Sequence, residues 1–226
     1  AAAIALVRHP ELRFILVGDE AQIAPELEAN PQVADKSEII HTDIAISMDA
    51  KPSQALRRGR WKSSMWLAIQ AVRDGQADAV VSAGNTGALM AMSKFCLKTI
   101  KGVDRPAIAA IWPTVDAECI VLDVGANVGA DSRQLVEFTL MGAAMARSVF
   151  GLDRPTVGLL NVGSEDLKGN DAVRGASARL RDGTTLGVID EVVTALVYNN
   201  PLEARYRKPS GVEGRYHLRF AVEPLV

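Results

Sequence analysis

Short runs of aliphatic and β-branched residues alternate along this chain with longer stretches of helical periodicity, and this alternation limits the fold more than any other feature. The runs are almost continuously apolar, as strands are when helices cover both faces of a parallel sheet. Strand–helix alternation favours parallel strands joined by right-handed crossovers. The sequence therefore predicts an α/β fold with a mostly parallel, doubly wound, Rossmann-like sheet.

The expected elements follow from the same pattern. Strands are predicted at residues 14–17, 38–41, 79–82, 107–111, 120–124 and 157–161. Helices are predicted at residues 21–29, 52–58, 64–74, 86–100, 132–150 and 170–180. The alternation ends near residue 183: an apolar segment at 187–197 is compatible with either a helix or a strand, and a turn-rich, basic tail follows it.

The composition narrows the class of protein. Apolar residues make up 48% of the 226 residues and charged residues 23%, as in a globular protein with a substantial core. A net charge of −2 gives no reason to expect nucleic acid binding. Cys96 and Cys119 stand in apolar surroundings, which predicts buried reduced thiols in a cytoplasmic protein without a metal site. No run of 18 apolar residues and no signal-peptide pattern is present, and no cofactor is expected.

Three loops rich in glycine and asparagine follow predicted strands. They are Ser-Ala-Gly-Asn-Thr-Gly at 82–87, Asp-Val-Gly-Ala-Asn-Val at 123–128, and the longer segment 162–170. In a parallel sheet the carboxyl ends of the strands lie along one edge, and ligands bind in the crevice outside it. We therefore expect the three loops to converge at that edge.

The first loop suits an anionic ligand. Gly84 and Gly87 allow close backbone approach and conformations that other residues avoid. Thr86 and Gly87 stand at a predicted helix start, where free N–H groups favour an anion. Lys168 supplies a cation just before another predicted helix. The predicted phosphate ligands are Ser82, Gly84, Asn85, Thr86 and Gly87.

Simpler explanations exist for each loop. The 82–87 segment is also typical of an ordinary helix N-cap, the 123–128 segment of a structural turn, and Lys168 of a solvated surface lysine. A Walker-type phosphate loop and the Gly-x-Gly-x-x-Gly dinucleotide pattern are both absent from the sequence, which weakens the hypotheses of a nucleoside triphosphatase or an NAD-dependent enzyme.

Several motifs together resemble the PlsX-type phosphate acyltransferase family in order and spacing. These are Ile-His-Thr at 40–42, Arg-Arg at 57–58 leading to Ser-Ser-Met at 63–65, the 82–90 and 100–106 segments, Leu-Asp-Val-Gly-Ala-Asn at 122–127, and Gly-Leu-Leu-Asn-Val-Gly-Ser-Glu at 158–165 followed by Lys-Gly-Asn at 168–170. The resemblance covers about residues 10–182. It assigns residues 1–183 to the acyltransferase core, incomplete at its N-terminus, and leaves 184–226 as a divergent or truncated tail.

The resemblance implies an acyltransferase that moves a fatty acyl group from acyl carrier protein to inorganic phosphate, which yields acyl phosphate for phospholipid synthesis. It implies a fold related to phosphotransacetylases and isocitrate dehydrogenases, a homodimer, and peripheral association with the inner face of the cell membrane. The catalytic candidates are Lys168, Asn127, Asn170 and His41, with Asp123 and Glu165 as orienting residues. A lone histidine at a strand end such as His41 is, however, more often structural.

A basic segment stands between two predicted helices and has two interpretations. Arg57, Arg58, Arg60 and Lys62 form either a solvated helix boundary or a docking patch for the acidic acyl carrier protein. Two other functions remain open for the chain. One is a phosphate acetyl- or butyryltransferase that uses coenzyme A, and the other is a non-catalytic fragment that retains a phosphate site.

Overall fold

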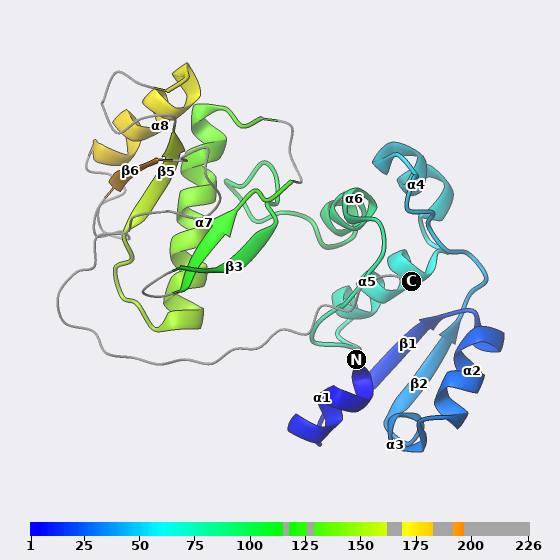
Figure 1. The fold of residues 1–226 in the computed structure, drawn as a ribbon. Helices are drawn as coiled ribbons and strands as arrows, with labels where there is room; N and C mark the ends of the chain where they lie inside the picture. Colours follow the sequence, from blue (N-terminus) through cyan, green and yellow to red (C-terminus); the bar gives the residue numbers. More distant parts are fainter. Residues whose placement is uncertain (115–117, 126–128, 162–168, 183–191, 197–226) are drawn as a thin grey trace. The chain divides into compact units, whose positions relative to one another are not determined.

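The computed structural model describes residues 1–114, 118–125, 129–161, 169–182 and 192–196. The chain divides into two compact units (Figure 1): residues 1–100 belong to the first, and the described residues from Lys101 onward belong to the second. The predicted boundary at residue 183 falls in a segment outside the described residues, so the division into a core and a tail stays a prediction.

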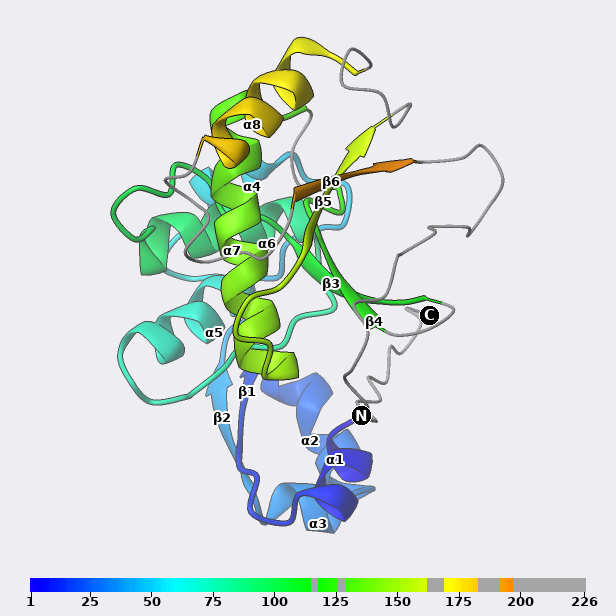
Figure 2. The ribbon, with the colours of Figure 1, turned by 90° about the vertical axis from the view of Figure 1, so that its left-hand side faces the viewer.

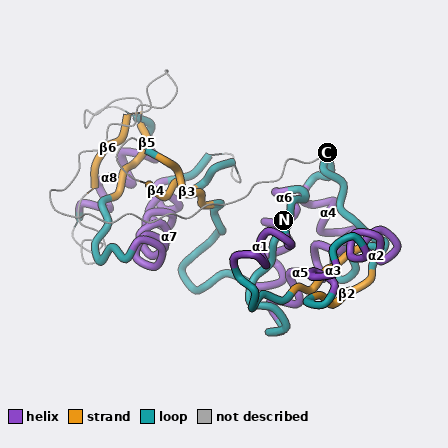
Figure 3. The backbone as a smooth tube through the Cα atoms, turned by 60° about the horizontal axis from the view of Figure 1, so that its bottom comes forward, coloured by secondary structure: helices purple, strands orange, loops and turns teal. Residues whose placement is uncertain are grey.

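The first unit combines a parallel strand pair with six helices among its described residues. Its elements are α1 (Ala2–Arg8), β1 (Phe14–Gly18), α2 (Glu20–Glu28), α3 (Pro31–Ala34), β2 (Ser37–His41), α4 (Pro52–Gly59), α5 (Ser64–Arg73) and α6 (Thr86–Leu97). In the β1–β2 pair Phe14 lies opposite Ser37 and Gly18 opposite His41. The short crossover through α2 and α3 packs against this pair (Figure 3). The carboxyl ends of both strands therefore meet at Gly18 and His41.

Three helices of the first unit share one hydrophobic core. Trp66 and Ile69 of α5 pack with Met92 of α6 and Ala55 of α4, and all four are almost completely buried. The helix α5 begins at the N-cap residue Ser63, whose Oγ accepts a hydrogen bond from the Trp66 N–H at 3.2 Å. This cap fixes the start of α5 where the indole ring enters the core.

The second unit holds a hairpin, two helices and a second parallel pair. Its elements are β3 (Ala109–Pro113), β4 (Glu118–Leu122), α7 (Ser132–Phe150), β5 (Val157–Asn161), α8 (Asp171–Arg181) and β6 (Val192–Leu196). The strands β3 and β4 are antiparallel, whereas β5 and β6 are parallel. The helices α7 and α8 pack side by side (Figure 2), and their core with β5 contains Ala143, Leu159, Ala176 and Leu180.

The predicted α/β class is confirmed, and all six predicted helices are present within a few residues of their expected bounds. The described strands form three two-stranded sheets. The parallel pairing is therefore distributed over β1–β2 and β5–β6. The ambiguous segment at 187–197 contains a strand, β6.

One pair is antiparallel in a fold predicted to be mostly parallel, and one predicted strand was wrong; each has a physical reason. The β3–β4 pair is a hairpin because the four-residue connection at 114–117 is far too short for a parallel crossover. Residues 79–82 form no strand. Val81 is 97% exposed, and Val80 is the residue of this segment that packs against the core. An apolar run becomes a strand only when a partner strand accepts its backbone hydrogen bonds.

No helix in the described part of the chain is long and apolar enough to cross a membrane.

Candidate functional site

The 82–87 loop is organised by its own side chains. The Ser82 Oγ accepts a hydrogen bond from the Gly84 N–H at 3.2 Å, which makes a tight polar turn. Asn85 then caps α6, because its Oδ1 accepts a hydrogen bond from the Ala88 N–H at 2.9 Å. The sequence interpretation of this segment as a helix N-cap is therefore confirmed, and its role as an anion site must be judged from the groups that the cap leaves free.

Asn85 also fastens the loop to a distant part of the first unit. Its Nδ2 donates to the carbonyl oxygens of Met48 at 2.6 Å, Ala50 at 2.9 Å and, more weakly, Ser47 at 3.3 Å. The residue is only 8% exposed. Both amide hydrogens thus point at backbone carbonyls. In this arrangement the side chain positions the loop and does not present a free donor to an anion, which corrects its predicted role as a ligand.

The two loop glycines are needed for close packing. A Cβ on Gly87 would stand 2.8 Å from Cγ of the Pro52 ring, and one on Gly84 would stand 3.0 Å from Cε of Met65. Neither glycine has a positive φ. The expectation that they adopt conformations forbidden to other residues was wrong, and close approach of their backbone to an anion stays a prediction.

The start of α6 retains free donors. Thr86 is exposed and stands in the first turn of the helix. No described residue accepts a hydrogen bond from the backbone N–H of Thr86 or Gly87. Two unpaired N–H groups at the positive end of a helix dipole, next to the half-buried Ser82 hydroxyl, form a small anion-compatible surface.

His41 stands at the carboxyl end of β2 and is exposed. Its Nδ1 accepts a hydrogen bond from the backbone N–H of Glu20 at 3.1 Å, at the start of α2. An accepting Nδ1 requires the neutral ring to carry its proton on Nε2. His41 therefore links the carboxyl end of β2 to the start of α2, and its predicted part in catalysis stays a prediction.

The basic segment leads from α4 into α5. Arg57 and Arg58 occupy the last turn of α4, and Arg60 is the C-cap residue. The loop continues through Trp61 to Lys62, whose backbone carbonyl accepts a hydrogen bond from the Thr42 Oγ1 at 2.7 Å. The segment is thus attached to the chain just beyond the carboxyl end of β2.

The remaining predicted site residues belong to the second unit. Asp123 follows β4 with a φ of +65°, and its backbone N–H donates to the Ile108 carbonyl at 2.8 Å. Asn170 caps α8 by accepting from the Val173 N–H at 2.9 Å. Asn127, Glu165 and Lys168 lie outside the described residues. The expectation that the three loops follow strands of one parallel sheet was wrong, because residues 79–82 form no strand and β4 and β5 belong to different sheets.

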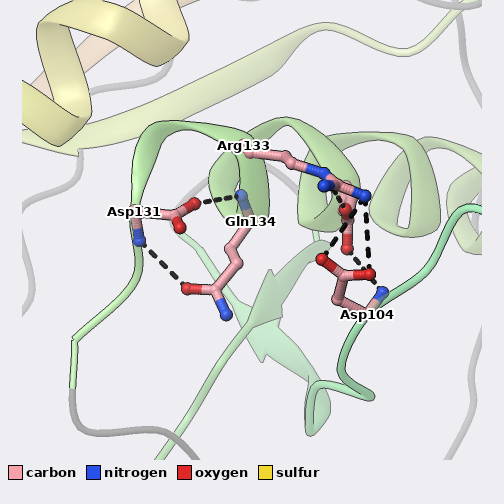
Figure 4. A network of polar contacts seen from close by, with 5 residues as sticks. Asp104, Asp131, Arg133 and Gln134 are labelled. Atoms are coloured by element: carbon pink, nitrogen blue, oxygen red, sulfur yellow. Dashed lines mark hydrogen bonds and ion pairs between the residues drawn. The ribbon is translucent and has the colours of Figure 1, made fainter.

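A polar network in the second unit was missed by the sequence reasoning (Figure 4). The nearly buried Glu137 on α7 accepts hydrogen bonds from the Asp104 N–H at 2.9 Å and from Arg133 Nε at 3.1 Å. Arg133 also reaches the Asp104 carboxylate at 3.4 Å. The i,i+4 spacing of Arg133 and Glu137 was a usable signal, but the partner at Asp104 had none. The network holds the segment before β3 against α7.

Comparison with known proteins identifies the family. A family model described as "Fatty acid synthesis protein" matches residues 1–190. The chain belongs to this family. Curated relatives named phosphate acyltransferase include one from Mesorhizobium japonicum, which is 60% identical over 175 residues. That match covers 77% of this chain and 49% of the relative. The family resemblance predicted from the motifs is thereby confirmed.

Other relatives match over similar lengths. A phosphate acyltransferase from Parvibaculum lavamentivorans is 55% identical over 207 residues, which cover 85% of this chain and 57% of the relative. The chain spans about half the length of the curated relatives it matches. Among solved structures, the EutD phosphotransacetylase from Staphylococcus aureus matches with a TM-score of 0.54 at 20% identity, over 87% of this chain and 64% of that chain. This second similarity concerns the fold alone.

Proposed function

We propose that the protein transfers a fatty acyl group from acyl carrier protein to inorganic phosphate and so forms acyl phosphate for phospholipid synthesis. The observation that carries the proposal is the start of α6, where unpaired N–H groups and two hydroxyls lie on a loop that Asn85 holds in place. Relatives at 54–60% identity that are named phosphate acyltransferase support the same reaction class.

The chemistry requires positioning more than a strong base. Phosphate is already anionic at neutral pH, so one of its oxygens can attack the thioester carbonyl carbon directly. The C–S bond then breaks, the thiolate leaves and takes up a proton, and acyl phosphate is the product. Binding both reactants in register and stabilising the tetrahedral oxyanion are the main tasks of the protein.

Each candidate residue has a proposed role in this scheme. Ser82, Thr86, Gly87 and Lys168 hold the phosphate, while Gly84 and Asn85 keep the loop in its binding conformation. Asn127 and Asn170 polarise the thioester carbonyl, and His41 assists the leaving thiolate. Asp123 and Glu165 orient the lysine and the loop amides. The proposal includes a homodimer in the cytoplasm, associated peripherally with the inner face of the membrane.

The test begins with the purified chain, acylated acyl carrier protein and phosphate, and the readout is acyl phosphate trapped with hydroxylamine. A parallel reaction with short-chain acyl coenzyme A distinguishes an acetyl- or butyryltransferase from the proposed enzyme. Lys168→Ala is expected to reduce phosphate-dependent transfer at least about tenfold, because it removes the one cation assigned to the phosphate. Unchanged phosphate kinetics in this variant would remove the lysine from the site.

A thermal melt with and without phosphate accompanies the assay. Phosphate that binds the folded chain raises its melting temperature. A melting shift without acyl phosphate formation would indicate a phosphate-binding fragment without turnover. The proposed function would be refuted for this chain if phosphate caused no melting shift and no acyl phosphate formed.

A further inference from the structure

The segment from Lys51 to Lys62 carries a strong local excess of positive charge. It contains five basic residues and no acidic one, and all five are exposed: Lys51, Arg57, Arg58, Arg60 and Lys62. Within the described part of the chain none of them forms an ion pair. These cations are therefore not neutralised within the first unit and remain available to an external anion.

Two tryptophans give this charged surface a fixed centre. The Arg60 guanidinium lies over the Trp61 ring at 4.7 Å from its centroid and over the Trp66 ring at 5.6 Å. The two rings are 4.9 Å apart and tilted by 60°. Trp66 is buried in the core, whereas Trp61 is 56% exposed. An exposed tryptophan and arginine anchored on a buried ring are the residue types that most often dominate the binding energy of protein interfaces.

The backbone holds this centre in an unfavourable conformation. Trp61 has a φ of +72°, which is strained for a bulky residue and persists only when neighbouring contacts fix it. Here the Thr42 Oγ1 donates to the Lys62 carbonyl, and the Ser64 N–H donates to the Ile44 carbonyl at 2.9 Å. A loop fixed in this way loses little conformational entropy when a partner binds.

The basic surface lies close to the candidate phosphate site within the same unit. Pro52, the first residue of α4, touches Gly87, while the arginines stand at the other end of that eight-residue helix. At about 1.5 Å per residue, the helix spans roughly 12 Å. The chain between Thr42 and Ala50 also connects the two places, because it is fastened to Lys62 at one end and to Asn85 at the other.

We infer that Arg57, Arg58, Arg60, Trp61 and Lys62 form the docking surface for an acidic protein that delivers the acyl group on a flexible arm. This inference rests on the proposed function. The charge of the surface complements an acidic partner, and its distance from the α6 N-terminus suits an arm that must reach the phosphate. A protein partner is favoured over a lipid surface for two reasons. Trp61 is the one exposed large apolar side chain of the segment, and its indole ring lies against Trp66 and Arg60.

The test measures binding of purified acyl carrier protein to the folded chain by surface plasmon resonance at several salt concentrations. The double variant Arg57→Gln/Arg58→Gln is expected to lower the association rate about three- to tenfold at low salt and to flatten its salt dependence. Trp61→Ala is expected to raise the dissociation constant about tenfold, mainly through faster dissociation.

The matched control is Arg13→Gln/Lys36→Gln, which removes the same charge from two exposed positions. These positions stand beside the amino ends of β1 and β2, at the other end of the strands from His41. It is expected to bind the carrier with a dissociation constant within about twofold of wild type. Thermal melts of each variant establish that it is folded.

The outcomes separate this inference from the proposed function. Wild-type carrier binding by both Arg57→Gln/Arg58→Gln and Trp61→Ala would overturn the docking surface, even if acyl phosphate still forms. If these variants lose carrier binding while the control Arg13→Gln/Lys36→Gln binds the carrier like wild type, the result would support the docking surface even if the chain shows no turnover. Variant-sensitive binding to phosphatidylglycerol vesicles, without carrier binding, would also overturn it in favour of a membrane contact.

Discussion

The Asn85 side chain both caps α6 and fastens the 82–87 loop to the backbone of Met48 and Ala50. Replacing it by aspartate separates these two roles. The substitution keeps the size of the side chain and the oxygen that caps α6 through the Ala88 N–H. It removes the amide group that donates to Met48 and Ala50 and places an anionic oxygen against their carbonyls. Asparagine and aspartate are about equally good N-caps, so capping alone predicts almost no change.

The magnitude follows from the donated bonds. Two hydrogen bonds in a nearly buried position contribute about 0.5–1.5 kcal/mol each, and a carboxylate facing carbonyl oxygens adds repulsion. We therefore expect Asn85→Asp to lower the free energy of unfolding of the first unit by about 2–4 kcal/mol at pH 7. Protonation of the introduced carboxyl restores one donor. The deficit is therefore expected to be smaller near pH 4 than at pH 7, because the folded state raises the pKa of that carboxyl.

The assay is urea unfolding followed by tryptophan fluorescence in a Trp112→Phe background. Of the three tryptophans only Trp61 and Trp66 then remain, and both report on the first unit. The matched control is Asn170→Asp, since the exposed Asn170 caps α8 through the Val173 N–H. Followed by circular dichroism, it is expected to change stability by less than about 0.5 kcal/mol. An Asn85→Asp protein as stable as wild type would refute the fastening role and leave the cap alone.

Three further changes test other contacts. Gly59→Ala would place a Cβ 2.5 Å from Ile46 Cδ1 and 2.9 Å from Cε of the buried Met92. We therefore expect urea unfolding to show a free energy of unfolding lowered by about 1–3 kcal/mol. An unchanged free energy would mean that the Ile46 and Met92 side chains move aside without cost. Arg133→Ala leaves the nearly buried Glu137 without its ion-pair partner and is expected to destabilise the second unit by about 1–3 kcal/mol, whereas Arg147→Ala on the exposed face of α7 serves as the control. Hydrogen bonds from the Gln22 side chain and then the Ala21 N–H hold the pKa of Asp19 below its ordinary value. The stability that this carboxylate adds is therefore present above about pH 3.9 and is lost as the pH falls through its folded pKa. An NMR titration that places the Asp19 midpoint at or above the ordinary value would contradict this.

Elements with complete local signals could be predicted from the sequence. The helix α7 has the predicted bounds, and its local signals are complete: Asp131 and Gln134 form a capping box at its start, and Gly151 ends it with a left-handed residue. The strand β5 was predicted equally well, since its four apolar or small residues and Asn161 stand between clear turn signals. In both cases the residues that specify the element lie within it or within a few positions of its ends.

Features that depend on distant partners could not be predicted. The 79–82 segment has strand-like residues, but strand formation depends on a neighbour that the local sequence does not specify. The 82–87 loop was correctly recognised as a helix start, yet the role of Asn85 is set by carbonyls more than thirty residues earlier. The stacking of Arg60 on Trp61 and Trp66 likewise depends on the strained turn between α4 and α5.

The separation between Asn85 and its acceptors bears on when the candidate site forms during folding. The three carbonyls lie 35 to 38 positions before Asn85 in the sequence, so the loop reaches its final shape only after that length of chain has closed. Local helix formation at α6 is far faster than such long-range closure. A peptide that contains the 82–97 segment alone would therefore form at most a frayed helix with a capped end. The anion-compatible geometry is a property of the folded unit and cannot be transplanted with the motif.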